Sequence, residues 1–286
     1  TPDKGQQLLK LLSGANYKYM KMAQELQNNR NKPAYFSDIA CTLLVTDSEN
    51  YIIRYQTYTK VINAKRYARL CHGDVYDIMR MILRYSLFDM SNQQWSIGVG
   101  LYDEISAQLG IGFEMFASPL NFNMPAYCSL FLDTDRAFGS VGSFYNLSIE
   151  DIRQLGLHGV FYNPPYLPLL MATTTRMCID LLDKMQAARE EFMMVSFLPN
   201  WADADYIQSF LASRYTIFHQ VVPKGQYVLH EKDKGKLIRG TFDLLFVVMN
   251  SQAGEWEEAR RQGLVQVCEN IVGVMKRELL EKNIDK

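Results

Sequence analysis

The sequence predicts an α/β protein in which helices cover both faces of a mostly parallel sheet, preceded by a helical segment. Two observations support this. Up to about residue 109, apolar residues recur every three or four positions, which is the spacing of an amphipathic helix. From Gly110 onward, short apolar runs alternate with helical patterns, an order typical of a parallel sheet. We therefore expect a helical domain over residues 1–109 and an α/β domain over residues 110–286.

The N-terminal segment contains two clear helical patterns. In the first, apolar side chains recur from Leu8 to Leu26, and Pro33 follows its end. In the second, Asp74 is a suitable N-cap for a helix whose apolar stripe continues to Tyr85. No repeat and no glycine-rich linker interrupts the segment, so we expect it to fold as one helical unit.

Short apolar runs after Gly110 are the candidate strands. They cover residues 111–116, 127–132, 159–162, 192–198, 215–222 and 242–249. A helical pattern over residues 167–190 separates the third run from the fourth. Ligands of parallel α/β sheets bind beyond the C-terminal ends of the strands. The residues that follow each run are therefore the candidate functional site.

Composition and charge exclude several classes of protein. The 286 residues, 48% of them hydrophobic, suffice for one large domain or two moderate ones. A net charge of -1 argues against non-specific binding to nucleic acid, although a local basic groove is compatible with it. Five scattered cysteines without a CxxC pair, and four histidines without ligand spacing, predict no disulfide framework and no metal site.

The ends of the chain carry little information on location. No targeting signal and no apolar run of membrane-spanning length is visible, so we expect an intracellular protein that does not act at a membrane. The first residue is Thr1 and not methionine, which indicates a fragment of a longer chain.

Two basic stretches are candidate contacts for nucleic-acid phosphates. Residues 51–69 carry five basic residues and no acidic one, interleaved with tyrosines, and residues 224–239 carry five basic residues against two acidic ones. A basic groove with aromatic side chains suits single-stranded nucleic acid. A solvated charged face is the alternative for each stretch. The candidate residues are Lys65, Arg66, Arg69, Lys224 and Arg239.

The ends of the first two predicted strands suit a nucleoside cofactor. A carboxylate followed by small residues lets the backbone turn close to a ligand, and an acid at the neighbouring strand end can accept both ribose hydroxyl hydrogens. Ordinary turns and helix caps are the alternative. Neither a glycine-rich dinucleotide motif nor GxxxxGK[ST] occurs, so NAD and ATP are poorly supported. The candidate residues are Glu114, Phe116, Ala117, Ser118, Pro119, Leu120, Asn121, Asp133 and Asp135.

The third predicted strand ends in Asn163-Pro164-Pro165-Tyr166. The two prolines fix an extended backbone, which directs the Asn163 side-chain carbonyl and the Pro164 backbone carbonyl at one point. Two such acceptors can hold an exocyclic amino group. Tyr166 can offer its ring face to a planar base, with a stacking energy of roughly 1–3 kcal/mol, so the hydroxyl is predicted to be dispensable. A Pro-Pro turn with a packing tyrosine is the alternative.

These motifs resemble those of a known enzyme family. Asn-Pro-Pro-Tyr after a central strand is similar to the signature of amino-group methyltransferases that use S-adenosylmethionine. Five ordered blocks between residues 113 and 223 resemble the phosphorylated-CTD-interacting-factor family of cap-specific adenosine-N6 methyltransferases of mRNA. The blocks are FEMFASPLN, YCSLFLDTDRAFGSVGSF, GVFYNPPY, MMVSFLPNW and SRYTIFHQVVP. Family members carry Phe at the position of Tyr166.

The resemblance implies a Rossmann-like, seven-stranded class I methyltransferase sheet, in which the strand near residues 242–249 or its neighbour is antiparallel. It also implies S-adenosylmethionine as cofactor, capped mRNA as partner, the first transcribed adenosine as target and a nuclear location. Asn163, Pro164, Pro165 and Tyr166 would then be catalytic. Family members have a WW domain with paired tryptophans, whereas the three tryptophans here are widely spaced. We therefore expect no WW domain and no binding to the phosphorylated polymerase tail. The three are Trp95, Trp201 and Trp256.

Three other functions are compatible with the same motif. The chain can be interpreted as a DNA adenine-N6 methyltransferase, which has to extrude its base from the duplex. It can also be interpreted as a protein glutamine methyltransferase, because an amide nitrogen suits the same acceptor pair. The third interpretation is a non-catalytic RNA-binding or scaffold protein that has kept the fold.

Overall fold

The computed structural model describes residues 17–18, 20–24, 28, 42–45, 50–55, 58–63, 75–87, 95–231 and 236–281. Between residues 42 and 63 only the backbone is described. None of the helices in these ranges is long and apolar enough to cross a membrane.

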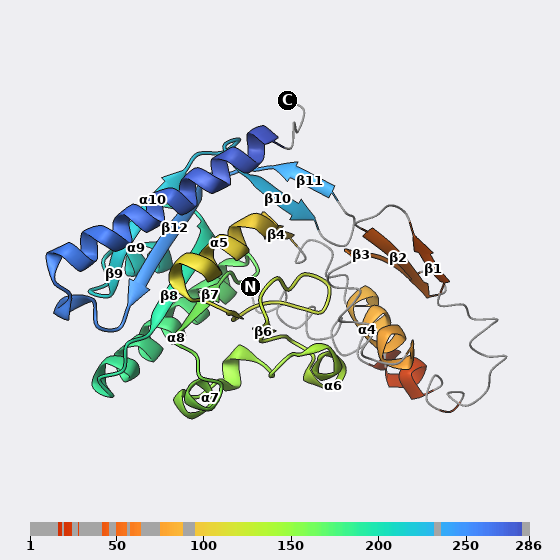
Figure 1. Cartoon of the computed structure of the whole chain (residues 1–286). Helices are drawn as coiled ribbons and strands as arrows, with labels where there is room; N and C mark the ends of the chain where they lie inside the picture. Colours follow the sequence, from red (N-terminus) through yellow and green to blue (C-terminus); the bar gives the residue numbers. More distant parts are fainter. Residues whose placement is uncertain are drawn as a thin grey trace.

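A six-stranded sheet forms the centre of the molecule (Figure 1). Its strands, in spatial order, are β6 (Ala126–Tyr127), β5 (Phe113–Glu114), β7 (Gly159–Tyr162), β8 (Met193–Pro199), β12 (Leu244–Asn250) and β9 (Thr216–Val222). All run parallel except β12, which is antiparallel to both neighbours, as the resemblance implied. The chain passes from β5 to β6 on one side and then to β7 on the other. The sheet therefore has a switch point between β5 and β7, where ligands of Rossmann-like folds bind.

The seventh strand of the expected sheet is not among these six. At the β6 edge, where the sheet would continue, Tyr127 forms one parallel bridge with Ser140. The Val141 N–H donates to the Tyr127 carbonyl at 3.0 Å, and the Ser129 N–H donates to the Gly142 carbonyl at 2.8 Å. Gly142 has a φ of 126°, a conformation that favours glycine, so the chain turns away after three residues.

Helices cover both faces of the sheet (Figure 1). Because side chains alternate along a strand, Val160 and Tyr162 of β7 face one apolar cluster and Phe161 faces the other. The first cluster includes side chains of α7 (Ile149–Gln154), α8 (Pro168–Ala187) and α9 (Asp205–Leu211). The second includes side chains of α5 (Val99–Leu109) and α10 (Glu258–Glu281). The α/β prediction is confirmed as a Rossmann-like arrangement.

A small antiparallel sheet lies beside the central one. Its strands, in spatial order, are β11 (Lys236–Arg239), β10 (Val228–Glu231) and β4 (Trp95–Ile97). The β10–β11 hairpin is an insertion between β9 and β12, and hydrogen bonds close its base. The Gly225 N–H donates to the Gly240 carbonyl at 2.7 Å, and the Gly240 N–H donates to the Tyr227 carbonyl at 2.9 Å.

We had predicted that the N-terminal segment is helical throughout, but the structure shows strands in it as well. Three strands, β1 (Thr42–Val45), β2 (Asn50–Tyr55) and β3 (Tyr58–Asn63), form a separate antiparallel sheet. This stretch is rich in isoleucine, valine and tyrosine, which favour strands. The second predicted helix is confirmed as α4 (Val75–Leu87). The domain boundary at residue 110 stays a prediction, although α5, which precedes it, covers the central sheet.

Candidate active site

The Asn163–Tyr166 motif lies where the fold places ligands, at the C-terminal end of β7 beside the switch point. Tyr162 pairs with Ser196 of the parallel strand β8, so Asn163 leaves the sheet next to Phe197. Asn163 is half-buried and Pro164 is buried. The expected position of the motif after a central parallel strand is therefore confirmed.

The hydroxyl of Tyr166 has a partner that the sequence interpretation missed. It donates to Asn163 Oδ1 at 3.1 Å and lies 3.5 Å from the Phe197 carbonyl oxygen. Burial raises the pKa of Tyr166 well above its usual range, so the hydroxyl stays protonated and remains a donor. The prediction that the hydroxyl is dispensable stays a prediction, and this hydrogen bond is a reason to test it. The stacking role of the ring stays a prediction.

Aromatic side chains from a distant part of the chain hold the Tyr166 ring. The Phe242 ring meets it edge-on, with centroids 5.6 Å apart and planes at 89°. Behind Phe242 lies Tyr227, whose ring is 6.0 Å away and whose hydroxyl donates to the Phe242 carbonyl at 2.8 Å. No sequence motif marks these residues, because the β10–β11 hairpin separates them along the chain.

The carboxylate predicted at the end of β5 organises the loop that leads to β6. Glu114 is buried, and its Oε1 accepts the backbone N–H groups of Asn123 and Met124, the latter at 2.7 Å. Further along the loop, Asn121 Oδ1 accepts the Ser118 N–H at 2.7 Å and its hydroxyl at 3.1 Å. The structure thus gives Glu114 and Ser118 roles in shaping the loop.

The predicted cofactor residues after β5 differ in their access to solvent. Phe116, Ala117 and Asn121 are half-buried. The Phe116 ring packs against Phe144 and Tyr162, at centroid distances of 5.1 and 5.8 Å. The others are buried in the loop, where a ligand cannot reach their side chains without rearrangement. These are Glu114, Ser118, Pro119 and Leu120.

The two predicted ribose-binding acids are separated by the fold. Both lie on α6 (Leu132–Asp135), but Asp133 is exposed and Asp135 is fully buried. Asp133 faces Arg84 and Arg80 of α4, at 3.6 and 4.0 Å. Asp135 Oδ2 accepts the Tyr85 hydroxyl at 2.6 Å. This burial argues against Asp135 as the ribose ligand and leaves Asp133 as the accessible acid of the pair, and the ribose assignment stays a prediction.

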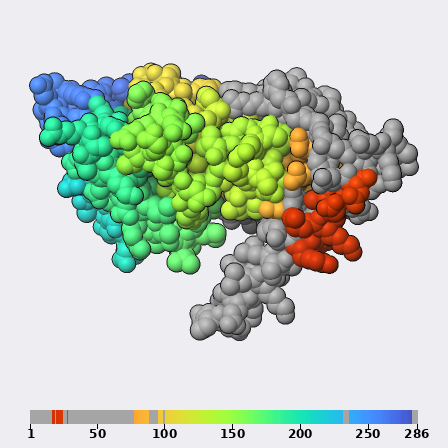
Figure 2. Space-filling model, turned by 90° about the horizontal axis from the view of Figure 1, so that it is seen from below, coloured from red at the N-terminus to blue at the C-terminus, as the bar shows by residue number. Residues whose placement is uncertain are grey.

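Asp135 also fixes α4 against the sheet domain. Figure 2 shows the orange surface of α4 beside the yellow-green surface of the segment that carries α6. Burial raises the pKa of Asp135 to about 6, while hydrogen bonds from Tyr85 and Thr134 oppose the shift. In addition, the Arg84 guanidinium lies over the Phe131 ring, 4.4 Å from its centroid.

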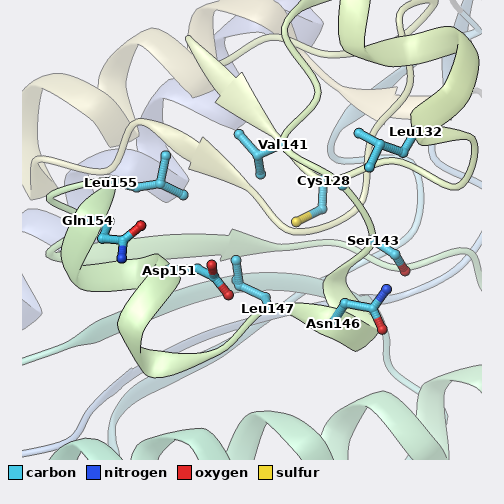
Figure 3. Close-up of a pocket in the computed structure, with 10 residues that line it drawn as sticks. Cys128, Leu132, Val141, Ser143, Asn146, Leu147, Asp151, Gln154 and Leu155 are labelled. Atoms are coloured by element: carbon cyan, nitrogen blue, oxygen red, sulfur yellow. The ribbon is translucent and has the colours of Figure 1, made fainter.

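A pocket of about 460 Å³ opens beside the end of β6 (Figure 3). None of the sequence-predicted site residues lines it, but Cys128 does, and its carbonyl accepts the Ala117 N–H at 2.9 Å. Burial raises the pKa of the Cys128 thiol to about 12, so the thiol stays protonated and is no nucleophile. The other lining residues are Leu132, Val141, Gly142, Ser143, Asn146, Leu147, Asp151, Gln154 and Leu155.

The basic candidates fall into two groups. Lys65, Arg66 and Arg69 lie outside the described residues. Lys224 and Arg239 are exposed at the base of the β10–β11 hairpin, where Arg239 Nε donates to the Gly225 carbonyl at 2.8 Å. The two are therefore close together, beyond the C-terminal end of β9. Among the described residues, no group of three His, Cys, Asp or Glu side chains is arranged to hold a metal ion.

The fold and the motif define a Rossmann-like protein with an Asn-Pro-Pro-Tyr site at the switch point of its sheet. A family model described as Phosphorylated CTD interacting factor 1 WW domain matches residues 55–232. Since this is more than half of the chain, the chain belongs to that family.

Two curated relatives agree with the family assignment. They are named mRNA (2'-O-methyladenosine-N(6)-)-methyltransferase and come from Mus musculus and Homo sapiens. Each is 31% identical to this chain over 125 residues, which is 43% of this chain. The match covers only 16% of the length of either relative.

The family match corrects one expectation. The matching model has a WW domain in its description, which contradicts the absence of such a domain that we inferred from the tryptophan spacing. The conclusion about the polymerase tail therefore no longer holds. The matched residues contain β5 to β9 of the central sheet, whereas β12 and α10 lie beyond the match.

Proposed function

We propose that the protein transfers a methyl group from S-adenosylmethionine to N6 of an adenosine in RNA, most specifically the first transcribed adenosine of capped mRNA. The observation that carries this proposal is the position of Asn163 and Pro164 at the C-terminal end of β7. The names of the relatives, which specify a 2'-O-methyladenosine of mRNA, support the same reaction. On this proposal the enzyme acts in the nucleus, where mRNA is made.

The accessible residues fit S-adenosylmethionine. Phe116, Ala117 and Asn121 are half-buried at the end of β5, and the exposed carboxylate of Asp133 suits a pair of ribose hydroxyl groups. The buried candidates shape this surface from below. When bound, the cofactor would supply an electrophilic methyl group on its sulfonium.

Asn163 and Pro164 would activate the amine by orienting it. The lone pair of adenine N6 is delocalised into the ring, which makes it a poor nucleophile. Hydrogen bonds from its two N–H groups to the Asn163 side-chain carbonyl and the Pro164 backbone carbonyl would increase the sp3 character of N6, and its lone pair would then point in one direction. The acceleration would come from positioning and from fixed dipoles. The methylated nitrogen is then a positively charged ammonium that readily loses its proton to water, so no strong base is needed.

Lys224 and Arg239 would contact phosphates of the RNA. Both are exposed beyond the C-terminal end of β9. This end lies on the same side of the sheet as the C-terminal end of β7, which carries Asn163. Phosphate contacts of this kind add affinity without sequence preference. On this proposal the two residues hold the RNA chain, while the motif after β7 selects the amine.

The deciding experiment offers several acceptors to the protein in parallel. These are a capped RNA that begins with adenosine or 2'-O-methyladenosine, the same RNA without a cap, duplex DNA and a glutamine-containing peptide. With labelled S-adenosylmethionine, mass spectrometry of the digested products should find N6-methyladenosine from the capped RNA that begins with adenosine and N6,2'-O-dimethyladenosine from the one that begins with 2'-O-methyladenosine. Asn163→Ala should slow the formation of either product about 100- to 1000-fold. If only DNA or only the peptide were methylated, that acceptor would be the substrate in place of RNA. If no acceptor were methylated, the result would favour a non-catalytic binding protein.

A further inference from the structure

We propose that the hydroxyl of Tyr166 is a positioning group, which holds the Asn163 amide with its carbonyl oxygen available to the substrate amine. This inference rests on the proposed function and deepens it. It gives Tyr166 a second role besides the ring face that the motif predicts. It also distinguishes this chain from the family members that have phenylalanine at this position.

The argument begins with the two orientations of an asparagine side chain. A half-turn of the amide exchanges its oxygen, which accepts hydrogen bonds, with its NH2 group, which only donates them. The Tyr166 hydroxyl donates to Asn163 Oδ1 at 3.1 Å. A carbonyl oxygen has two lone pairs, so one remains for an N–H of the substrate. In the reversed orientation, the NH2 group would face the amine as donor against donor.

The hydroxyl hydrogen has one favoured acceptor. Besides Asn163 Oδ1, the Phe197 carbonyl oxygen lies within reach, but at the longer distance of 3.5 Å. A hydroxyl carries a single hydrogen, and O–H···O hydrogen bonds are usually about 2.5–3.0 Å long, a range that the distance to Asn163 nearly reaches and the distance to Phe197 does not. The bond to Asn163 is therefore the stronger of the two, and the Phe197 carbonyl limits the directions that the hydroxyl can take.

The ring that carries this hydroxyl is itself held in place. Phe242 meets it edge-on at 5.6 Å, and the Leu167 N–H donates to the Pro165 carbonyl at 2.7 Å directly after the two prolines. A donor on a fixed ring can select one orientation of its acceptor, whereas a mobile donor follows the acceptor. Family members with phenylalanine must orient the asparagine by other contacts.

Tyr166→Phe tests the proposal, with Tyr227→Phe as its matched control. Both changes remove one hydroxyl from the same aromatic cluster, but the Tyr227 hydroxyl bonds to the Phe242 backbone at 2.8 Å and not to Asn163. The measurements are kcat and KM on the capped RNA that begins with adenosine, the dissociation constant of the cofactor and the Tm. Counting active sites by cofactor binding keeps a loss of folded protein from being counted as slower chemistry.

We expect Tyr166→Phe to lower kcat about tenfold, which is the scale of one lost hydrogen bond, with KM and cofactor affinity nearly unchanged. Tyr227→Phe should leave kcat within about twofold. In the Asn163→Ala background, Tyr166→Phe should have no further effect, because the hydroxyl acts through Asn163. Equal kcat values for wild type and Tyr166→Phe, equal losses in the two phenylalanine variants, or additive losses in the double variant would each overturn the proposal. A wild-type protein that methylates no acceptor would instead refute the proposed function itself.

Discussion

Removal of the Tyr85 hydroxyl measures how strongly α4 is attached to the sheet domain. Tyr85 and Asp135 are 2% and 0% exposed, and the hydroxyl donates to Asp135 Oδ2 at 2.6 Å. Because burial raises the Asp135 pKa to about 6, the carboxyl group is mostly ionised at pH 7.5 and mostly protonated at pH 5. The same hydrogen bond is therefore charge-assisted at the higher pH and neutral at the lower one.

We predict that Tyr85→Phe loses more unfolding free energy at pH 7.5 than at pH 5. A hydrogen bond to a charged group contributes about 1.5–3 kcal/mol and a neutral one about 0.5–1.5 kcal/mol. The variant should therefore lose about 2 kcal/mol of unfolding free energy at pH 7.5 and about 1 kcal/mol at pH 5. The sign follows from linkage. The hydroxyl stabilises the ionised carboxylate, so its removal raises the folded-state pKa further, and the loss grows as pH rises through about 6.

Urea unfolding followed by circular dichroism at both pH values is the assay. Tyr127→Phe is a matched control, because its buried hydroxyl donates to an uncharged group, the Phe138 carbonyl, at 3.2 Å. The control should lose about 1 kcal/mol at either pH. A loss for Tyr85→Phe that is the same at pH 5 and pH 7.5 would refute a buried ionised Asp135.

Other changes give separate outcomes. Because the folded pKa of Asp135 is about 6, against an ordinary value of 3.8, stability should fall by about 3 kcal/mol as pH rises from about 4 to about 6. Asp135→Asn should flatten that part of the stability curve, and an unchanged curve would count against the assignment. Asn163→Ala should slow methylation about 100- to 1000-fold with cofactor affinity nearly preserved, as single-turnover assays and calorimetry can show, and normal activity would end the amino-methyltransferase proposal. Replacing Lys224 and Arg239 by Glu should weaken binding equally for all RNA sequences and reduce its salt dependence by about one unit of slope per residue, whereas an unaltered slope would leave both residues as solvated surface.

Local sequence information was sufficient for the motif after β7. Pro164 and Pro165 restrict their own backbone, and the run before them is apolar at every position because β7 is buried on both faces. The same kind of information predicted α4 and the strand β12, whereas the antiparallel direction of β12 came from the family resemblance. In each case the residues that determine the structure are neighbours along the chain.

Contacts between distant segments could not be predicted in this way. Asp133 and Asp135 look alike in sequence, and only the docking of Tyr85 onto α6 buries one of them. Phe242 reaches Tyr166 from beyond a hairpin, so no spacing relates them. Strands β2 and β3 could not be distinguished from a charged helix face, because their isoleucine, valine and tyrosine residues are interleaved with the basic residues Arg54 and Lys60.

Hydrogen bonds at the base of the β10–β11 hairpin make the geometry of the site independent of the length of the hairpin. Gly225, Tyr227 and Gly240 join the two arms before the chain reaches Phe242, so residues added between the arms need not displace the Phe242 ring. The entropy cost of a longer loop grows only with the logarithm of its length. An affinity tag or a fluorescent protein inserted between Glu231 and Lys236 should therefore leave the Phe242 ring in place. A reporter inserted there would lie at the opposite end of the hairpin from the exposed Lys224 and Arg239, so it would leave the proposed RNA contacts at the base free while methyl transfer continues.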